Sequence, residues 1–350
     1  MEEIIVSASI TYKVLIERGL LARVGELSAP LIRGRHAAII SDSNVWPLYG
    51  PAVEESLRGA GFTVDSFVFP AGETSKNLGI LGEILTFLAR KEFTRQDAVF
   101  ALGGGVTGDM GGLASSLFLR GIPYVQIPTS LLAMVDSSVG GKTAVDLPEG
   151  KNLVGTFTQP VLVVCDPDAL KTLEPAVYAE GWAEIIKYGM ILSRGLLEFL
   201  LDNPVGTDIE KVIADCVTMK RDVVASDERD TGGRQILNFG HTIGHAIERC
   251  AGYRYYHGEG VAMGMAVMTR GCIAKGCCPK ACGRILEKLL EKYHLPKTCD
   301  IPREDLLKAA RADKKRRGDQ ITLIEPRDVG RCVLVKTGFG ELDEILRLGL

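Results

Sequence analysis

The chain has 350 residues, a length that corresponds on the usual prior to two domains. Hydrophobic residues make up 46% of it and charged residues 24%, which excludes a disordered or fibrous protein. A net charge of -3 gives no reason to expect nucleic acid as a partner. No uncharged apolar run approaches the ~20 residues of a membrane span, and no signal peptide is visible at the N-terminus. Nine cysteines without framework spacing fit reduced thiols, so we expect a cytoplasmic protein.

The first half of the chain alternates short apolar runs with helical segments. The runs end in Asp, Gly or Pro, and they predict strands at residues 36–41, 62–69, 97–102, 123–127 and 161–165. Residues 78–90 have the leucine and isoleucine spacing of a helix. Strands that alternate with helices favour a parallel sheet covered on both faces. We therefore predict an α/β domain over residues 1–173.

The sequence pattern changes near residue 174. Residues 175–312 have the 3.6-residue periodicity of helices, punctuated by Gly and Pro, with almost no strand-like run. Residues 320–324 and 331–335, separated by turn residues, suggest a late pair of strands. The prediction for residues 174–350 is a mostly α-helical domain.

Three of the five histidines fall within seventeen residues of the helical half: His241, His245 and His257. His241 and His245 are four residues apart and share one helix face, so both can point at the same small volume. Imidazole nitrogens suit zinc and similar divalent ions. The pattern favours a metal site, and a pair of ordinary core or capping histidines is the alternative.

Glu184 is a candidate third ligand. It lies among apolar residues, three positions before Lys187 and on the same helix face. A surface ion pair with Lys187 is the default explanation, yet a buried carboxylate needs a cation or a metal beside it. With two histidines, Glu184 would complete a three-ligand site that leaves positions open for substrate oxygens, as catalytic zinc requires.

A glycine-rich turn, GGGVTGD at residues 103–109, follows a predicted buried strand. Gly103, Gly105 and Gly108 satisfy the G-x-G-x-x-G pattern, which lets backbone N–H groups approach a pyrophosphate. The usual acid does not end the next strand, and Asp42, at the end of an earlier strand, is the candidate partner for a ribose. We expect a phosphate-binding loop in a variant arrangement, and a purely structural turn is the alternative.

A second glycine-containing segment surrounds lysines at residues 136–152. Paired glycines beside Lys142, followed by Lys151 and Asn152, permit the close approach of an anion. A solvated loop is the alternative. The run of basic residues at 314–317 is by itself more typical of a solvated face than of a binding site.

Four cysteines lie close together in the helical half, namely Cys272, Cys277, Cys278 and Cys282. Their spacing is not a paired C-x-x-C, and no histidine accompanies them. We therefore expect structural or incidental thiols, with a metal cluster as the alternative.

Taken together and in order, these segments resemble the 3-dehydroquinate synthase family over nearly the full length. The matching motifs are GETSK at 72–76, GGGVTGD at 103–109, FLRG at 118–121, the segment 135–145, EIIK at 184–187, NFGHTIGHAIE at 238–248 and HGE at 257–259. The resemblance implies an N-terminal Rossmann-like domain that binds NAD and a C-terminal helical domain, with the active site between them.

The resemblance also assigns roles to individual residues. It implies that Glu184, His241 and His257 hold a divalent metal, usually zinc with cobalt as a substitute, whereas His245 handles protons and is not a ligand. Arg120 would reach the phosphate site of a neighbouring subunit, which implies a homodimer. Contacts to NAD would come from Asp42, Gly72, Glu73, Lys76, Gly105, Val106, Thr107, Gly108, Asp109, Thr129, Ser130, Lys142 and Lys151. Substrate contacts would come from Asn152, Lys187, Lys220, Arg234, Asn238 and Lys314, with Lys315 as the alternative to Lys314.

Four positions depart from the common family pattern. Ala71 replaces an Asp, Ser130 a Thr, Met134 a Gln and Asp146 an Asn. Ser130 keeps a hydroxyl, so we expect its contact to persist, whereas Asp146 adds a negative charge near the cofactor loop. None of the four belongs to the expected metal set.

The reaction implied by the resemblance converts 3-deoxy-D-arabino-heptulosonate 7-phosphate to 3-dehydroquinate and phosphate. It proceeds by transient oxidation with NAD, elimination of phosphate, reduction and intramolecular aldol closure. Three rival readings are a cyclase that acts on another sugar phosphate, a metal-dependent polyol dehydrogenase, and a non-catalytic metal-binding protein. The dehydrogenase would release NADH in each turnover, and the binding protein would leave the glycine loop without a purpose.

Overall fold

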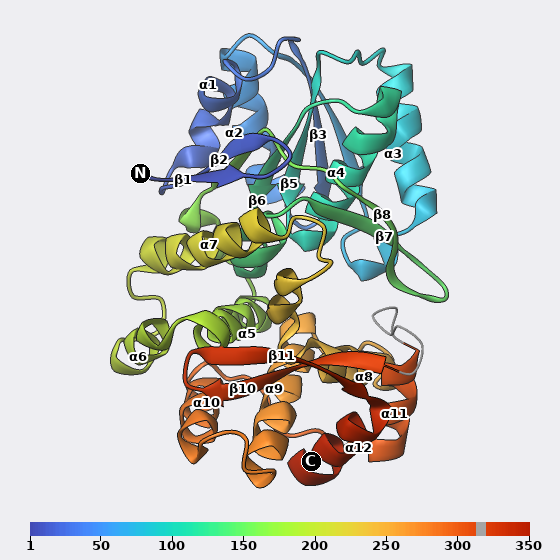
Figure 1. Ribbon diagram of the computed structural model, residues 1–350. Coiled ribbons are helices and arrows are strands. Elements are labelled where there is room, and N and C mark those ends of the chain that lie inside the picture. Colours follow the sequence, from blue (N-terminus) through green and yellow to red (C-terminus); the bar gives the residue numbers. More distant parts are fainter. Residues whose placement is uncertain (313–319) are drawn as a thin grey trace. The chain divides into compact units, whose positions relative to one another are not determined.

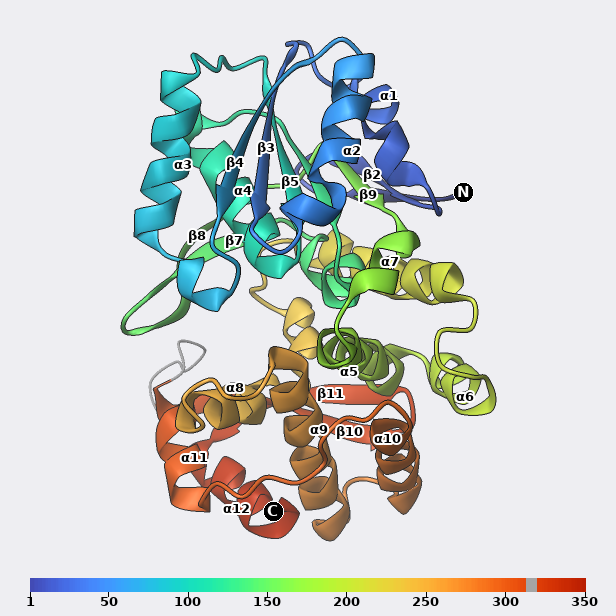
Figure 2. The same ribbon diagram turned by 180° about the vertical axis from the view of Figure 1, so that it is seen from behind.

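The computed structural model describes residues 1–312 and 320–350 (Figures 1 and 2). Contacts divide the chain into two compact units, the first made of Met1–Leu173 and Ile209–Arg229, the second of Glu174–Asp208 and Asp230–Leu350. The predicted second domain included residues 209–229, whereas the structure packs this segment in the first unit. Among the described helices, none combines the length and apolar character needed to cross a membrane.

The first unit is built on a seven-stranded sheet of order β1-β2-β9-β6-β5-β3-β4. The β1–β2 pair is antiparallel, and every other neighbouring pair is parallel. The strands are β1 (Glu2–Ser7), β2 (Thr11–Ile16), β3 (His36–Asp42), β4 (Thr63–Phe69), β5 (Ala98–Gly103), β6 (Tyr124–Pro128) and β9 (Leu162–Cys165). The helices of this unit are α1 (Val24–Ser28), α2 (Trp46–Gly59), α3 (Leu78–Arg90), α4 (Gly105–Leu117) and α7 (Ile209–Ser226).

Helices cover both faces of this sheet, as Figure 1 shows for α2 and α3. Strand β3 explains why, because its alternate residues enter two different cores. Ala37 and Ile39 pack with the α1 and α2 side, whereas Ala38 and Ile40 pack with the α3 and α4 side. All six residues of β5 are buried, as expected for a central parallel strand. The predicted α/β class and the five predicted strands are confirmed.

The strand order creates a switch point between β3 and β5. From β3 the chain moves to β4 on one side and then returns to β5, β6 and β9 on the other. The crossover helices after β3 and β5 therefore lie on opposite faces, which leaves a crevice at the carboxyl ends of these two strands. Ligands of doubly wound sheets bind at this position, and Asp42 and the glycine-rich turn both lie there.

The segment whose glycines and lysines predicted the approach of an anion, with a solvated loop as the alternative, leads into an antiparallel hairpin, β7 (Lys142–Leu147) and β8 (Gly150–Phe157). Helix α7 completes the unit, where it packs beside β1, β2 and residues Ala133–Ser137. The sequence showed the helical period of α7 but not the core that it joins, because periodicity marks an apolar face without naming its partner.

The second unit is mostly helical and contains one hairpin. The predicted late strand pair is present as β10 (Gln320–Asp328) and β11 (Arg331–Gly338), which pair antiparallel. Figure 2 shows α9 and α10 beside this hairpin. The helices are α5 (Pro175–Leu192), α6 (Arg194–Asp202), α8 (His241–Cys250), α9 (His257–Ala274), α10 (Lys280–Lys292), α11 (Arg303–Arg311) and α12 (Phe339–Gly349), with a short 3₁₀ helix η6 (Gly233–Asn238) before α8.

Candidate functional site

Glycines bring α8 and α9 into direct backbone contact. A Cβ atom at Gly244 would lie 2.8 Å from the carbonyl carbon of Gly260, and one at Gly264 would lie 2.1 Å from the carbonyl oxygen of Gly240. Gly240 has φ +79°, a conformation that favours glycine, and α8 begins at the next residue. This packing sets the first turn of α9 against α8, so the histidines of the two helices meet. Their ring centroids are 5.2 to 5.7 Å apart.

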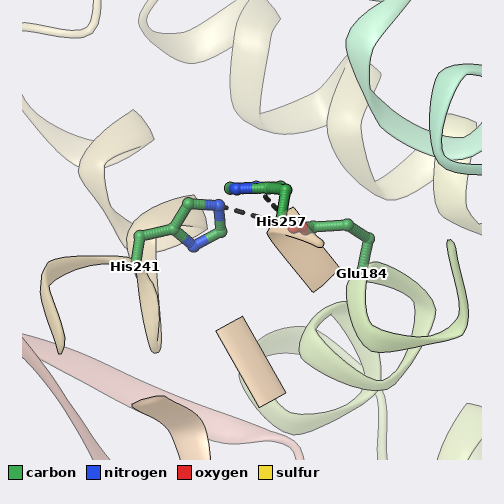
Figure 3. A group of neighbouring side chains, drawn as sticks. All are labelled: Glu184, His241 and His257. Atoms are coloured by element: carbon green, nitrogen blue, oxygen red, sulfur yellow. Dashed lines mark ion pairs between the residues drawn. The ribbon is translucent and has the colours of Figure 1, made fainter. Parts of the chain in front are cut away.

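Two of these histidines approach the same carboxylate oxygen (Figure 3). Nε2 of His241 and Nε2 of His257 each lie 3.4 Å from Oε1 of Glu184, which is 1% exposed on α5. Ligands about 2.0–2.1 Å from a tetrahedral zinc are about 3.3 Å from one another. Each nitrogen therefore already has the ligand–ligand spacing from this oxygen, and the three donor atoms lie within 4.8 Å of one another.

The other nitrogen of each ring, Nδ1, forms a hydrogen bond with an oxygen outside the proposed ligand set. Nδ1 of His241 donates to the carbonyl oxygen of Phe239 at 3.1 Å, and Nδ1 of His257 donates to Oε1 of Glu248 at 3.0 Å. With the Nδ1 proton engaged in this way, the Nε2 atom of each ring faces Glu184. Metal-binding histidines ordinarily have such an outer acceptor, which fixes the tautomer and the ring orientation.

Glu248 is a functional residue that the sequence interpretation missed. It is buried, seven residues after His241, and thus on the same face of α8. That spacing was the available signal. A carboxylate on a histidine-bearing face can orient a ligand from the adjacent helix as well as bind an ion itself.

Carboxylates crowd around His257. Burial lowers the pKa of His257, but the hydrogen bonds and charges of Glu184 and Glu248 outweigh it and raise the pKa to about 10. Burial raises the pKa of Glu180 to about 7, against the opposing effects of His257 and the N–H of Gly258. A divalent cation would neutralise this excess of negative charge, and it has to replace the proton of His257 in doing so.

The predicted pair of Glu184 and Lys187 is a buried ion pair, not a surface one. Nζ of Lys187 lies 2.5 Å from Oε2 of Glu184, and both side chains are 1% exposed. Glu184 therefore directs one oxygen to the lysine and the other to the two histidines. This arrangement places a cationic donor directly beside the candidate metal ligands.

The same region contains a second possible ligand set, His245, Glu248 and His257, whose donor atoms also lie within 4.8 Å of one another. His257 belongs to both sets. Glu248 already accepts the Nδ1 proton of His257, and this contact suits an orienting role better than direct ligation. We therefore assign Glu184 as the ligand, and the two sets are separable by mutation.

The predicted substrate residues lie on both units. Arg234 and Asn238 lie on η6, directly before His241, and Arg234 is 2% exposed. Lys220 on α7 is buried, and its Nζ lies 2.6 Å from the carbonyl oxygen of Asp136 and 3.0 Å from its Oδ1. Arg120 is exposed with φ +67°. Lys314 and its alternative Lys315 lie outside the described residues.

The residues predicted to bind NAD surround the switch point of the sheet. Helix α4 begins at Gly105, two residues after the end of β5, so its first N–H groups lie at the carboxyl edge. Oγ1 of Thr107 donates to Oδ2 of Asp42 at 3.2 Å, which joins the loop to the end of β3. A Cβ at Gly108 would lie 2.6 Å from Oε1 of Gln126, so this glycine permits close packing of the helix on the sheet.

A buried lysine links other members of the predicted NAD set. Nζ of Lys76 lies 2.6 Å from Oδ2 of Asp109 and donates to Oδ1 of Asn152 at 2.6 Å. Burial opposes the charge of Lys76, but Asp109 and Glu73 outweigh it, so its pKa is raised. Asp146, one of the departures from the family pattern, accepts from the backbone N–H of Asn152 at 2.7 Å. The structure thus brings Asn152, predicted as a substrate ligand, to Lys76, predicted to contact NAD.

The remaining members of the set lie around these two groups. Gly72 has φ +110° and precedes Glu73, whose carboxylate is 3.4 Å from Nζ of Lys151. The backbone N–H of Thr129 donates to the carbonyl oxygen of Gly103 at 3.0 Å. Oγ of Ser130 accepts from the N–H of Ala133 at 3.2 Å, and Lys142 is exposed at the start of β7.

The outer contact of Glu248 makes a prediction about metal affinity. Replacing Glu248 with alanine should weaken divalent metal binding by roughly 10–100-fold, because His257 loses the acceptor that orients its ring. Glu248→Gln keeps an acceptor oxygen and should retain most of the affinity. Calorimetric titration of both metal-free variants measures the effect, and equal affinities of wild type and Glu248→Ala would contradict the orienting role.

The fold and these side chains define a class, a doubly wound α/β domain joined to a helical unit with a candidate Glu-His-His metal centre. Family models described as 3-dehydroquinate synthase N-terminal and 3-dehydroquinate synthase C-terminal match residues 66–180 and 181–316. A 3-dehydroquinate synthase of Clostridium acetobutylicum is 43% identical over 97% of both chains. The chain therefore belongs to the 3-dehydroquinate synthase family.

Solved structures agree with this assignment. A 2-deoxy-scyllo-inosose synthase in complex with carbaglucose-6-phosphate, NAD+ and Co2+ superposes with a TM-score of 0.89 at 27% identity, covering all of both chains. The 2-epi-5-epi-valiolone synthase of Streptomyces hygroscopicus, with NAD+ and Zn2+ bound, has a TM-score of 0.87 at 26% identity over 97% of both chains. Both proteins have the fold of this chain.

Proposed function

We propose that the chain is a lyase that converts 3-deoxy-D-arabino-heptulosonate 7-phosphate to 3-dehydroquinate and phosphate, a step of the shikimate pathway. Identity of 43% to a 3-dehydroquinate synthase over nearly the full length supports this substrate. The observation that carries the proposal is the pair of imidazole nitrogens, each 3.4 Å from one oxygen of buried Glu184. That arrangement suits a site for a divalent ion with positions left open to substrate oxygens.

The proposed cofactors are NAD and a divalent ion, zinc or cobalt. Their chemistry would be reversible hydride transfer at one substrate carbon and a lowered pKa for the hydroxyl oxidised there. The imidazole and carboxylate donors of Glu184, His241 and His257 fit either ion. The N-terminus of α4 and the crevice between β3 and β5 fit a dinucleotide, and NAD+ with Co2+ or Zn2+ occurs in the two related cyclases.

The chain's own residues would bind and orient the substrate and move its protons. Lys187, beside Glu184, supplies a donor to a substrate oxygen next to the ion. Arg234 suits the carboxylate because its planar guanidinium binds two oxygens at once. Lys220, Asn152, Asn238 and Lys314 or Lys315 would hold the phosphate and hydroxyl groups. His245, whose ring lies 5.5 and 5.7 Å from those of His241 and His257, would exchange protons with the substrate.

The elimination step needs little additional chemistry from the protein. Once one substrate carbon is a ketone, the C–H bond of the adjacent carbon is acidic, and the departing phosphate dianion can accept that proton. Ring opening and aldol closure then occur within one molecule, so the site chiefly restricts the conformation of the chain. The net reaction releases phosphate without consuming an oxidant.

We also propose that the enzyme acts in the cytoplasm as a homodimer in which Arg120 contacts the phosphate site of the partner subunit. The exposed side chain of Arg120 and the left-handed conformation of Leu119 and Arg120 support an interaction role. Sedimentation analysis and an Arg120→Ala variant test this part of the proposal separately from the chemistry.

The direct test is phosphate release. Purified protein supplied with NAD and zinc should release one phosphate for each heptulosonate phosphate consumed and form 3-dehydroquinate in equal amount. Protein treated with a strong chelator should release none until zinc or cobalt is restored. Failure of the reconstituted enzyme to release phosphate from this substrate would refute the proposed activity.

NAD should be recycled within each turnover. Because the hydride returns to the same substrate molecule, NAD at one tenth of the substrate concentration should support complete conversion. The measurement is phosphate release followed together with absorbance of NADH, which should not accumulate. Release of one NADH for each substrate would support the polyol dehydrogenase alternative instead.

A further inference from the structure

A second group of metal-binding side chains lies at the far end of α9. Cys272 is in the last turn of this helix, Cys277 lies in the turn that follows, and Glu325 lies on β10. One donor atom from each lies within 4.8 Å of the other two. Cys272 and Glu325 are 0% and 4% exposed, so two of the three residues are shielded from solvent. The sequence showed the cysteines, but the carboxylate that joins them lies 48 residues farther along.

Local contacts hold the three donors in place. The backbone N–H of Cys277 donates to the carbonyl oxygen of Cys272 at 3.0 Å, which turns the chain back at the end of α9. Sγ of Cys277 contacts Oε2 of Glu325 at 3.9 Å. Arg327 pairs with the same oxygen at 2.8 Å and donates to the carbonyl oxygen of Cys277 at 3.3 Å. Both the turn and the strand are thereby fixed around the carboxylate.

The charge and spacing of this group suit a thiophilic divalent ion. Two thiolates and one carboxylate would be balanced by the ion together with the guanidinium of Arg327, so the buried group would be neutral. Sulfur ligands about 2.3 Å from a tetrahedral zinc are about 3.8 Å apart. The donor atoms here lie within 4.8 Å of one another, so zinc binding would shorten their separations by roughly 1 Å or less. Another sulfur atom, Sδ of Met268, lies 3.9 Å from Sγ of Cys272.

We propose that Cys272, Cys277 and Glu325 bind a zinc ion that stabilises the fold, with water as the fourth ligand, at a site distinct from the Glu184, His241 and His257 set. It lies about 22 Å along α9 from His257, at 1.5 Å for each residue. Zinc would tie the end of α9 to the β10–β11 hairpin and so stabilise the second unit. A donor set of two thiolates and one carboxylate favours zinc over Cu(I), which is softer, and over cations that prefer oxygen ligands alone.

Binding requires both thiols to release their protons to solvent. Burial raises the pKa of the Cys272 thiol, and the neighbouring Cys277 and Glu325 raise it further, so without an ion this thiol is protonated at neutral pH. Occupancy of the site should therefore increase as the pH rises.

Cobalt distinguishes this site from the proposed catalytic one. Thiolate bound to Co2+ produces a charge-transfer absorption band in the near ultraviolet, which imidazole and carboxylate ligands do not produce. Metal-free, reduced full-length protein titrated with Co2+ should bind two ions per chain, one of which gives this band. The readout does not depend on activity, so failure here and failure of the proposed reaction are distinguishable.

Variants test the ligands one at a time. Cys277→Ser should lose the band, bind zinc at this site about 100-fold or more weakly, and keep its activity on the substrate. Glu325→Gln, which leaves both thiols, should keep a weaker and shifted band, so it tests the site even if the serine variant is unstable. Cys250→Ser, which changes an exposed cysteine at the end of α8, is the matched control and should behave as wild type.

Two outcomes would overturn the proposal. One is a saturated wild-type protein that lacks the charge-transfer band. The other is a band of equal intensity and affinity in Cys277→Ser and in wild type.

Discussion

His257→Ala protein should bind no zinc at the proposed catalytic site and should be almost inactive. Its Nε2 atom already lies at ligand spacing from the carboxylate oxygen of Glu184, and loss of the ring leaves Glu184 and His241, which are too few donors to hold the ion. The loss of affinity should exceed the roughly 10–100-fold that removal of an outer contact costs. Metal content after dialysis against a weak chelator measures it, together with phosphate release.

His245→Ala is the matched control, because it removes an imidazole from the same cluster that we do not assign as a ligand. It should retain the metal and lose rate. If His257→Ala still held this ion with wild-type affinity, the assignment would be wrong. If His245→Ala lost the ion while Glu184→Gln kept it, the alternative set of His245, Glu248 and His257 would be the metal site.

The wild-type enzyme should prefer the carboxylated heptulosonate phosphate over sedoheptulose 7-phosphate by roughly 10²-fold or more in kcat/KM, about 3 kcal/mol. The reason is Arg234, whose side chain is 2% exposed and lies four residues before Asn238 on η6. A substrate without a carboxylate cannot form the charge-assisted hydrogen bonds that a carboxylate makes to a buried guanidinium. Steady-state kinetics on both substrates gives the ratio.

Arg234→Ala should lower kcat/KM for the carboxylated substrate far more than for sedoheptulose 7-phosphate. The ratio of the two kcat/KM values should therefore decrease. Arg234→Lys keeps the charge but loses the paired donors, so its preference for the carboxylated substrate should lie between those of the wild type and Arg234→Ala. Circular dichroism checks that each variant is folded, because Arg234 is buried. Comparable turnover of both substrates by the wild type would place the chain among cyclases of other sugar phosphates.

Much of the fold can be predicted from the sequence because burial gives apolar residues a regular spacing. Buried parallel strands appear as short apolar runs, and the predicted runs are β3, β4, β5, β6 and β9 of the structure. The β7–β8 hairpin was missed because only Thr143 and Val145 of β7 and no residue of β8 are buried, so the apolar signal is short. Helix α7 was detected as a helix, but its unit was not, since an amphipathic face does not specify its partner.

The sequence by itself determined which chemistry is available. Its motifs supplied the histidines, Glu184, the glycine turn and the resemblance to a family, because residue type and local spacing are written in the chain. Tertiary structure alone decided how these groups meet: the glycine contact of α8 with α9 aims two Nε2 atoms at one oxygen, and Glu248 holds His257 from outside. The same holds for Glu325, brought to Cys272 and Cys277 by a strand far along the chain. Proximity between distant segments arises from packing, which local sequence patterns do not encode.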